Sequence, residues 1–183
     1  LRNVIDPDIG IITNIGDAHR ENFTSDEEKA SEKLRLFSES STIIYCSDHR
    51  LPGRIIREDP VLCSKRLVDW SLTNREAVVY VSGKRSEANF TLLEISFEGK
   101  TGSYSVPFTD RASVENCITV ASACLAMGID HAIIARGLAG LSSVAMRMEI
   151  KNGINNCQLI EDYYNSDPGS LEMAIDYLRS QLN

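Results

Sequence analysis

The sequence lacks paired cysteines and basic segments. Its five cysteines are scattered and odd in number, and no two of them form a C-x-x-C pair. This pattern excludes a disulfide framework and a zinc finger, and it predicts reduced, mostly buried thiols in a cytosolic protein. The formal net charge is −7 and no run of Lys and Arg is present. Nucleic acids and anionic membranes are therefore not expected as partners, because both attract a positive surface.

Long hydrophobic runs and targeting segments are also missing. No apolar stretch approaches the roughly 18 residues that a transmembrane helix needs, so no membrane insertion is expected. The chain begins at Leu1 without a signal peptide or an initiating Met, which is typical of a cut inside a longer protein. Hydrophobic residues make up 43% of the 183 positions and charged residues 25%. This composition supports a folded core in one domain, or in one domain and part of another.

The first part of the chain predicts a strand, a helix and a second strand. Residues 9–15 are mostly β-branched, which is typical of a buried parallel strand. Residues 25–28 (S-D-E-E) form a capping-box pattern, so a helix is expected from there to about Glu39. The inward face of this helix has positions spaced i, i+4 and i+7, namely Ala30, Leu34 and Phe37. Residues 42–46 predict the next strand and complete a βαβ unit, whereas residues 50–75 give no clear pattern.

The rest of the chain predicts hairpins followed by helices. Alternating segments separated by turn residues indicate antiparallel strands at residues 77–82, 89–98 and 102–108. A mostly buried helix is expected over residues 113–127, and Asp130 caps the helix after it. Two further strands are expected at residues 147–151 and 157–160. A last helix covers residues 169–182, with Pro168 at or near its first turn.

Five motifs follow one another along the chain. Residues 12–19 read I-T-N-I-G-D-A-H, and Lys33 lies 14 residues after His19. Glu115-Asn116 precedes an Ala-rich helical segment that ends at Gly128. The last two motifs are R-M-E at residues 147–149 and E-D-Y-Y-N-S-D-P at residues 161–168. In this order the motifs resemble those of the Mur ligase family, and the fifth is similar to the D-D-x-Y-N-A-N-P run of its D-alanyl-D-alanine-adding branch.

The resemblance implies an α/β fold and an ATP-dependent ligase. Residues 1–145 would be part of the central ATP-binding domain, with a mostly parallel sheet, flanking helices and a small antiparallel sheet. Residues 146–183 would begin a Rossmann-like C-terminal domain. ATP would phosphorylate a peptide carboxylate, and an amine would then attack the acyl phosphate. The implied substrates are UDP-N-acetylmuramoyl-tripeptide and D-alanyl-D-alanine, the cofactors are ATP and Mg²⁺, and the compartment is the cytoplasm. No oligomeric state is implied.

Lys33 and His19 are the expected catalytic and metal-binding residues. Lys33 lies at the edge of the predicted inward face of its helix, where desolvation lowers the pKa of a lysine. A neutral amine can react with carbon dioxide to form a carbamate, which could bind Mg²⁺ or orient the substrate carboxylate. The alternative is a snorkelling lysine beside Glu28 or Glu32. His19 follows a predicted strand end, where α/β sheets place ligands, and its alternative is a loop histidine bonded to backbone.

Four further residues match positions that contact the nucleotide in the family. Asn116 is expected to contact adenine, unless it satisfies backbone groups at the start of a helix. Arg147 is expected to hold phosphates, with a surface salt bridge as the alternative. Asp162 is expected to accept ribose hydroxyls and Asn165 to shape the nucleotide pocket, with turn or cap roles as alternatives. The remaining histidines, His49 and His131, match no motif and are expected on the surface.

The sequence also departs from the family pattern. The phosphate-binding loop G-x-x-G-K-[ST] and the UDP-sugar-binding domain are absent, so the chain is not expected to be active alone. Residues 110–113 read D-R-A-S where the family has G-x-H-N. The residues around His19 resemble Bacteroidetes members, in which the ligase is often fused to an alanine racemase. The alternatives are another amide ligase of the superfamily, such as a diamino-acid-adding or folylpolyglutamate-type enzyme, and a catalytically dead Mur-like interaction module.

Overall fold

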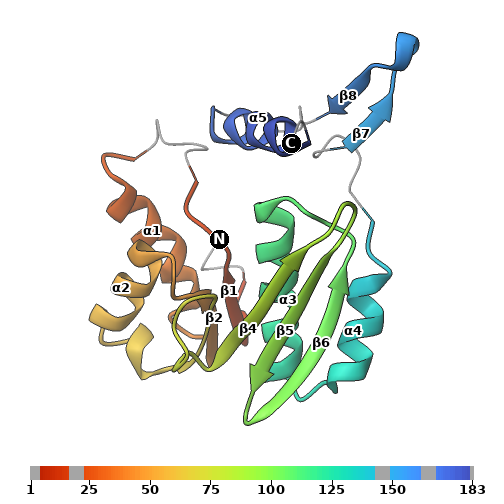
Figure 1. Cartoon of the computed structure of the whole chain (residues 1–183). Coiled ribbons are helices and arrows are strands. Elements are labelled where there is room, and N and C mark those ends of the chain that lie inside the picture. The colour runs from red at the N-terminus through yellow and green to blue at the C-terminus, as the bar shows by residue number, and fades with distance from the viewer. Residues whose placement is uncertain (1–4, 17–22, 143–148, 162–167, 182–183) are drawn as a thin grey trace. The chain divides into compact units, whose positions relative to one another are not determined.

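The computed structural model describes residues 5–16, 23–142, 149–161 and 168–181 (Figure 1). The chain divides into two compact units, the larger formed by residues 1–15 and 19–140 and the smaller by residues 16–18 and 141–183. Domains at residues 1–145 and 146–183 stay a prediction. Within the described ranges, no helix has both the length and the apolar character required to cross a bilayer.

The larger unit contains one six-stranded sheet. Its strands lie side by side in chain order: β1 (Ile9–Ile12), β2 (Thr42–Cys46), β3 (Arg66–Ser71), β4 (Val79–Ser86), β5 (Thr91–Phe97) and β6 (Lys100–Val106). The first four strands pair in parallel, and the last three form antiparallel pairs. The α/β class is therefore confirmed, and the predicted hairpins continue the parallel sheet.

The junction between β3 and β4 explains how hairpins can extend a parallel sheet. Parallel neighbours ordinarily need a long crossover that returns the chain to its starting edge. Here Trp70 pairs with Val79 and Ser71 with Tyr80, so the first residues of β4 lie beside the last residues of β3. The chain therefore continues in the direction of β3 and does not return to the other edge of the sheet, so a short loop is enough to connect the two strands.

Helices cover both faces of this sheet. They are α1 (Asp26–Leu34), continued by the 3-10 turn η2 (Arg35–Phe37), α2 (Arg50–Glu58) with η3 (Leu62–Ser64), α3 (Arg111–Ala126) and α4 (His131–Ala139). Strand β2 separates two apolar clusters, because Ile43 and Tyr45 pack towards α1 and α2 while Ile44 and Cys46 pack towards α3 and α4. Alternate residues of a strand point to opposite faces, so a strand buried on both sides is apolar throughout.

Helix α1 forms where its capping pattern predicts. The Ser25 hydroxyl accepts a hydrogen bond from the Glu28 backbone N–H at 3.1 Å, and Ala30, Leu34 and Phe37 are all buried as expected. The Glu28 carboxylate accepts from Thr24 rather than from Ser25, so the capping box is only half formed. The α-helix ends at Leu34, earlier than the predicted Glu39.

The helices on the other face are also capped, and the Asp130 cap was predicted. The Asp110 carboxylate accepts from the Ser113 backbone N–H at the start of α3, and the Asp130 carboxylate accepts from the Ala132 N–H at the start of α4. Gly128, which follows α3, has a φ of +78°, a left-handed conformation that favours glycine at a helix end.

The smaller unit contains β7 (Glu149–Asn152), the turn η4 (Ile154–Asn156), β8 (Gln158–Glu161) and α5 (Pro168–Gln181). The strands β7 and β8 pair in antiparallel fashion. Both strands and the helix with Pro168 in its first turn lie where the sequence predicts them.

The cysteines differ from the prediction in one respect. All five are free, as expected, but only Cys46 and Cys117 are buried, whereas Cys63 and Cys157 are exposed. The expectation of mostly buried thiols is therefore wrong. Burial raises the pKa of Cys46 and of Cys117 to about 11, which makes these two thiols poor nucleophiles at neutral pH.

Candidate active site

The carboxyl ends of β1, β2 and β3 meet at one edge of the parallel sheet. Open α/β sheets bind ligands at this edge, because the loops that follow the strands diverge there. Thr13 follows β1, Asp48 and His49 follow β2, and Leu72 follows β3. The candidate site is therefore built from these loop residues and from the helices beside them.

Lys33 lies in the last turn of α1 and is exposed. Partial burial of its amine lowers its pKa, and the charge of Lys29 lowers it further. Lys29, one turn earlier, is only 1% exposed, although helical spacing does not predict a buried lysine there. Both causes favour the neutral amine that carbamate formation requires.

The predicted alternative for Lys33 is a snorkelling lysine beside Glu28 or Glu32, and its exposed side chain is compatible with that role. Neither carboxylate forms an ion pair with Lys33 in the described ranges. The Glu28 carboxylate instead accepts hydrogen bonds from Thr24, and Glu32 pairs with Arg35 at 3.0 Å. No ion pair joins Lys33 to an acidic residue of the described ranges.

Asn116 lies in the second turn of α3 and is exposed. Asp110 caps this helix, so the alternative in which Asn116 satisfies backbone groups at a helix start does not apply. Its amide can both donate and accept, as recognition of the adenine edge requires. Lys33 and Asn116 lie on helices that cover opposite faces of the sheet.

Four of the predicted site residues, His19, Arg147, Asp162 and Asn165, lie outside the described residues. Their proposed roles stay predictions. The described part of the chain contains no group of three His, Cys, Asp or Glu side chains that could hold a metal ion. Of the expected metal ligands only Lys33 is described, and it would offer oxygen ligands only as a carbamate.

Sequence reasoning missed a charged cluster at the same edge of the sheet. The Nε2 atom of His49 lies 3.2 Å from a carboxylate oxygen of Glu115, and its Nδ1 atom lies 3.1 Å from the Thr13 carbonyl oxygen. The other Glu115 oxygen accepts from Arg111 Nε at 2.6 Å. The side chains of His49 and Glu115 are 20% and 15% exposed. His49 is therefore partly buried and engaged in this cluster, which the prediction of a surface residue did not include.

His131 is also less exposed than expected. It is partly buried between α4 and β6, where its Nδ1 atom forms a hydrogen bond with the Tyr104 hydroxyl. The ring also occupies the space that a side chain at Gly102 would need. This histidine therefore has a packing role on the hairpin side of the sheet.

The charges of the cluster stabilise one another. The hydrogen bond that His49 donates to the Glu115 carboxylate raises the pKa of His49 above its usual range, against the opposing effect of burial. Burial raises the pKa of Glu115, but hydrogen bonds from His49 and Arg111 outweigh it and leave that pKa lowered. At neutral pH the pair is therefore favoured in its charged form.

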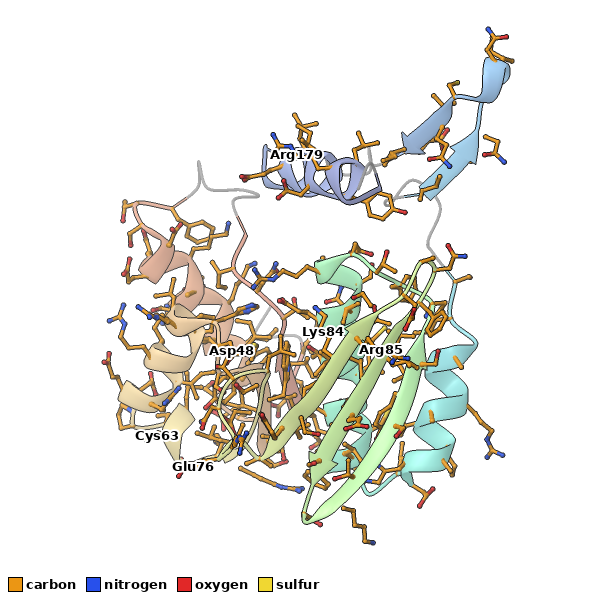
Figure 2. All side chains as sticks on the ribbon, viewed as in Figure 1. Asp48, Cys63, Glu76, Lys84, Arg85 and Arg179 are labelled. Carbon is orange, nitrogen blue, oxygen red and sulfur yellow. The ribbon has the colours of Figure 1, made fainter. Side chains whose placement is uncertain are left out.

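Asp48, labelled in Figure 2, stabilises the neighbouring loop. Its carboxylate accepts hydrogen bonds from the Ser71 hydroxyl, from the Leu72 backbone N–H at 2.8 Å and from the Thr73 hydroxyl at 2.7 Å. Burial alone would raise the pKa of Asp48, but these bonds lower it on balance. The segment after β2 is thereby tied to the segment after β3.

Comparison with known proteins identifies the family. A family profile described as the Mur ligase middle domain matches residues 1–125. The chain is 27% identical over 183 residues to the UDP-N-acetylmuramoyl-tripeptide–D-alanyl-D-alanine ligase of Bacillus subtilis. This alignment covers 98% of the chain and 38% of that relative, so the chain spans about two fifths of the relative's length.

Solved structures share the fold over almost the whole chain. A crystal structure of MurF from Acinetobacter baumannii is similar with a TM-score of 0.84 and 19% identity, covering 98% of this chain and 39% of that one. MurF from Thermotoga maritima in complex with ADP is similar with a TM-score of 0.76 and 16% identity, covering 97% and 40%. Since the family profile spans well over half of its residues, the chain belongs to the Mur ligase family.

Proposed function

We propose that this chain is part of an ATP-dependent ligase of peptidoglycan synthesis that adds D-alanyl-D-alanine to UDP-N-acetylmuramoyl-tripeptide. The similarity to the ligase of Bacillus subtilis along 98% of the chain carries this proposal. The run E-D-Y-Y-N-S-D-P at residues 161–168 also supports the proposal, because it resembles the D-D-x-Y-N-A-N-P run of the same branch. The cytoplasm, where its nucleotide-linked substrates are made, is the proposed compartment.

The reaction would pass through an acyl phosphate. ATP would phosphorylate the terminal carboxylate of the tripeptide, and the amine of D-alanyl-D-alanine would attack it and release phosphate. The protein's main tasks are to position the two reactants and to neutralise the charge on the phosphates. Bound Mg²⁺ would supply part of that neutralisation.

The proposed residue roles divide between two helices. Asn116 on α3 would contact adenine, in line with the ADP bound by the similar Thermotoga maritima protein. Lys33 on α1, as a carbamate, would orient the tripeptide carboxylate or bind Mg²⁺ with His19. Arg147, Asp162 and Asn165 keep their predicted nucleotide contacts. The sequence has no G-x-x-G-K-[ST] loop, so the 183 residues alone are not expected to catalyse the reaction.

Phosphate release by the complete gene product that contains this sequence tests the proposal. The enzyme would be supplied with ATP, Mg²⁺ and UDP-N-acetylmuramoyl-tripeptide, and D-alanyl-D-alanine, single amino acids and glutamate would be compared as acceptors. We expect phosphate release that depends on D-alanyl-D-alanine, with the UDP-pentapeptide as the product seen by mass spectrometry.

Two other outcomes would contradict the proposal in different ways. Release with another acceptor only would keep the ligase chemistry but assign the chain to a different branch. A folded protein that releases no phosphate with any acceptor would favour a Mur-like interaction module. The expected fusion to an alanine racemase stays a prediction, and the mass of the complete gene product tests it.

A further inference from the structure

Three elements meet at the ring of His49. Thr13 lies directly after β1, His49 directly before α2, and Glu115 in the second turn of α3. The ring of Trp70 on β3 contacts the His49 ring edge-on, with centroids 6.5 Å apart. The imidazole, which itself follows β2, therefore contacts the segment after β1, the strand β3 and the helix that carries Asn116.

The groups around His49 determine its protonation. The Thr13 carbonyl can only accept a hydrogen bond, and so can an ionised Glu115 carboxylate. Both ring nitrogens face these acceptors, at 3.1 Å and 3.2 Å. A neutral imidazole carries one N–H and can satisfy only one of them, whereas the imidazolium satisfies both. The arrangement is therefore complete only when His49 is charged.

Further hydrogen bonds hold the first turns of helix α3 in place. The Trp70 indole N–H donates to the Thr119 hydroxyl at 3.1 Å, and that hydroxyl donates to the Glu115 backbone carbonyl at 2.9 Å. Arg111 holds the carboxylate oxygen of Glu115 that His49 leaves free. The first turns of α3 are thus tied to β3 through Trp70 and to β1 through His49.

We propose that His49 is a positioning residue for the nucleotide: its imidazolium holds the segment after β1 against α3, through hydrogen bonds to Thr13 and Glu115, and so sets the position of Asn116. This inference rests on the proposed function. Asn116 directly follows Glu115, and the segment that begins at Thr13 leads to the predicted metal ligand His19. When His49 loses its proton, one of the two bonds is lost, and the nucleotide is held less well.

The neighbouring charges set the direction of the pH dependence. On α3, Glu115 favours the charged form of His49 and Arg111 opposes it. Asp48 in the same turn and the Cys46 thiol at the end of β2 also lie beside it, and β3 presents the uncharged Trp70 ring. Because the pKa of His49 is raised, its contribution is complete below the unfolded value of about 6.5 and is lost as the pH rises through the folded value.

The acidic limit has the opposite sign. The lowered pKa of Glu115 means that its contribution is present above its unfolded value and is lost as the pH falls through the folded value. Both hydrogen bonds of His49 are therefore formed only at pH values between the lowered pKa of Glu115 and the raised pKa of His49. Nucleotide affinity should be highest in this window.

Binding of a fluorescent ADP analogue to the complete gene product, between pH 5.5 and pH 9, tests the proposal. Wild-type affinity should fall roughly 3- to 30-fold as His49 titrates, a range typical of residues that act through another group. His49→Gln should bind weakly across the range, with wild type and variant converging at high pH. Glu115→Gln should move the wild-type midpoint to lower pH, and ¹³C-histidine NMR should show the same shift in the pKa of His49.

His131→Gln is the matched control, because His131 contacts Tyr104 on the hairpin side of the sheet, so the affinity of this variant and its pH dependence should stay as in wild type. Circular dichroism would establish that each variant is folded. A wild-type affinity that does not change as His49 titrates, or a His49→Gln variant that binds like wild type, would overturn this inference but not the proposed function. A folded wild type that binds no nucleotide at any pH would overturn the proposed function, and the inference with it.

Discussion

Lys29 and Lys33 lie one turn apart on α1 in different surroundings. Lys29 is 1% exposed, whereas Lys33 is exposed at the edge of the buried face. The charge of Lys29 adds to burial in lowering the pKa of Lys33. A carbamate on Lys33 would be an anion, so the same charge that favours the neutral amine would also attract the product. Lys29 would therefore favour the proposed carbamate in two ways.

Removing Lys29 should make the proposed ligase depend more strongly on bicarbonate. In Lys29→Gln the pKa of Lys33 rises, less neutral amine is present, and more bicarbonate is needed to reach half-maximal activity. We expect this bicarbonate concentration to shift upwards, because the charge of Lys29 is one of the two causes that lower the pKa of Lys33. Activity of the complete gene product against bicarbonate measures the shift, and ¹³C-bicarbonate NMR detects the carbamate directly.

Two variants separate this effect from a general loss of charge. Lys84→Gln removes an exposed lysine of β4, labelled in Figure 2, and should leave the bicarbonate dependence unchanged. Lys33→Ala should be inactive at every bicarbonate concentration. Full activity of Lys33→Ala without response to bicarbonate would show that the lysine is not carbamylated.

Single residues also show where sequence reasoning reaches its limit. The edge position of Lys33 follows from helical spacing within α1, so it could be predicted. His49 could not, because its meaning depends on Thr13, which is 36 residues away, and on Glu115, which is more distant still. The local signal is an Asp-His pair directly after a buried strand, which indicates a loop at the binding edge but names no partner.

At the scale of elements, Gly10 determines how β1 packs against the end of α1. A Cβ atom at Gly10 would overlap the ring of Phe37 in η2. Phe37 is 8% exposed and belongs to the cluster between the sheet and the helices α1 and α2. The absence of a side chain in β1 therefore allows the 3-10 turn after α1 to approach the sheet.

Gly10→Ala should lower the free energy of unfolding by about 1–3 kcal/mol, as expected for overpacking of a filled core. Combining it with Phe37→Leu should recover part of this loss, because the smaller side chain leaves room for the new methyl group. Denaturant unfolding of the single and double variants measures the coupling, and additive effects would contradict the packing argument. In Gly137→Ala, where the added Cβ meets open space in α4, stability should instead rise by about 0.5–1 kcal/mol.

Helix α2 shows why some elements could not be predicted. Its sequence contains Pro52 and Gly53, both poor helix formers, in a region that gave no clear pattern. Pro52 lies in the first turn, where its missing N–H is not needed. Gly53 is buried against the ring of Tyr45. Contacts with the sheet therefore specify this helix, whereas α3 and α4 are marked locally by apolar periodicity and Asp caps.

At the scale of the whole molecule, both described apolar clusters belong to the larger unit. Their members lie between Ile9 and Leu138, and no residue described beyond Leu138 contributes to either. The larger unit therefore contains in itself the buried surface that stabilises it. The motif order and the element order predicted most of this unit, because the strands and helices outside residues 50–75 have local signals and the family shares their arrangement.

Trp70 allows the independence of the larger unit to be measured. It is the single tryptophan of the sequence, is 1% exposed and belongs to the cluster beneath α3, so its fluorescence reports the unfolding of this unit. Truncation to residues 1–140 should leave the free energy of unfolding within about 0.5 kcal/mol, as for changes that share no partners. The dependence of the free energy of unfolding on denaturant concentration should also stay the same, because it is proportional to the surface area that unfolding of the larger unit exposes. A loss of several kcal/mol on truncation, or a steeper curve for the complete chain, would show that residues 141–183 fold together with the larger unit.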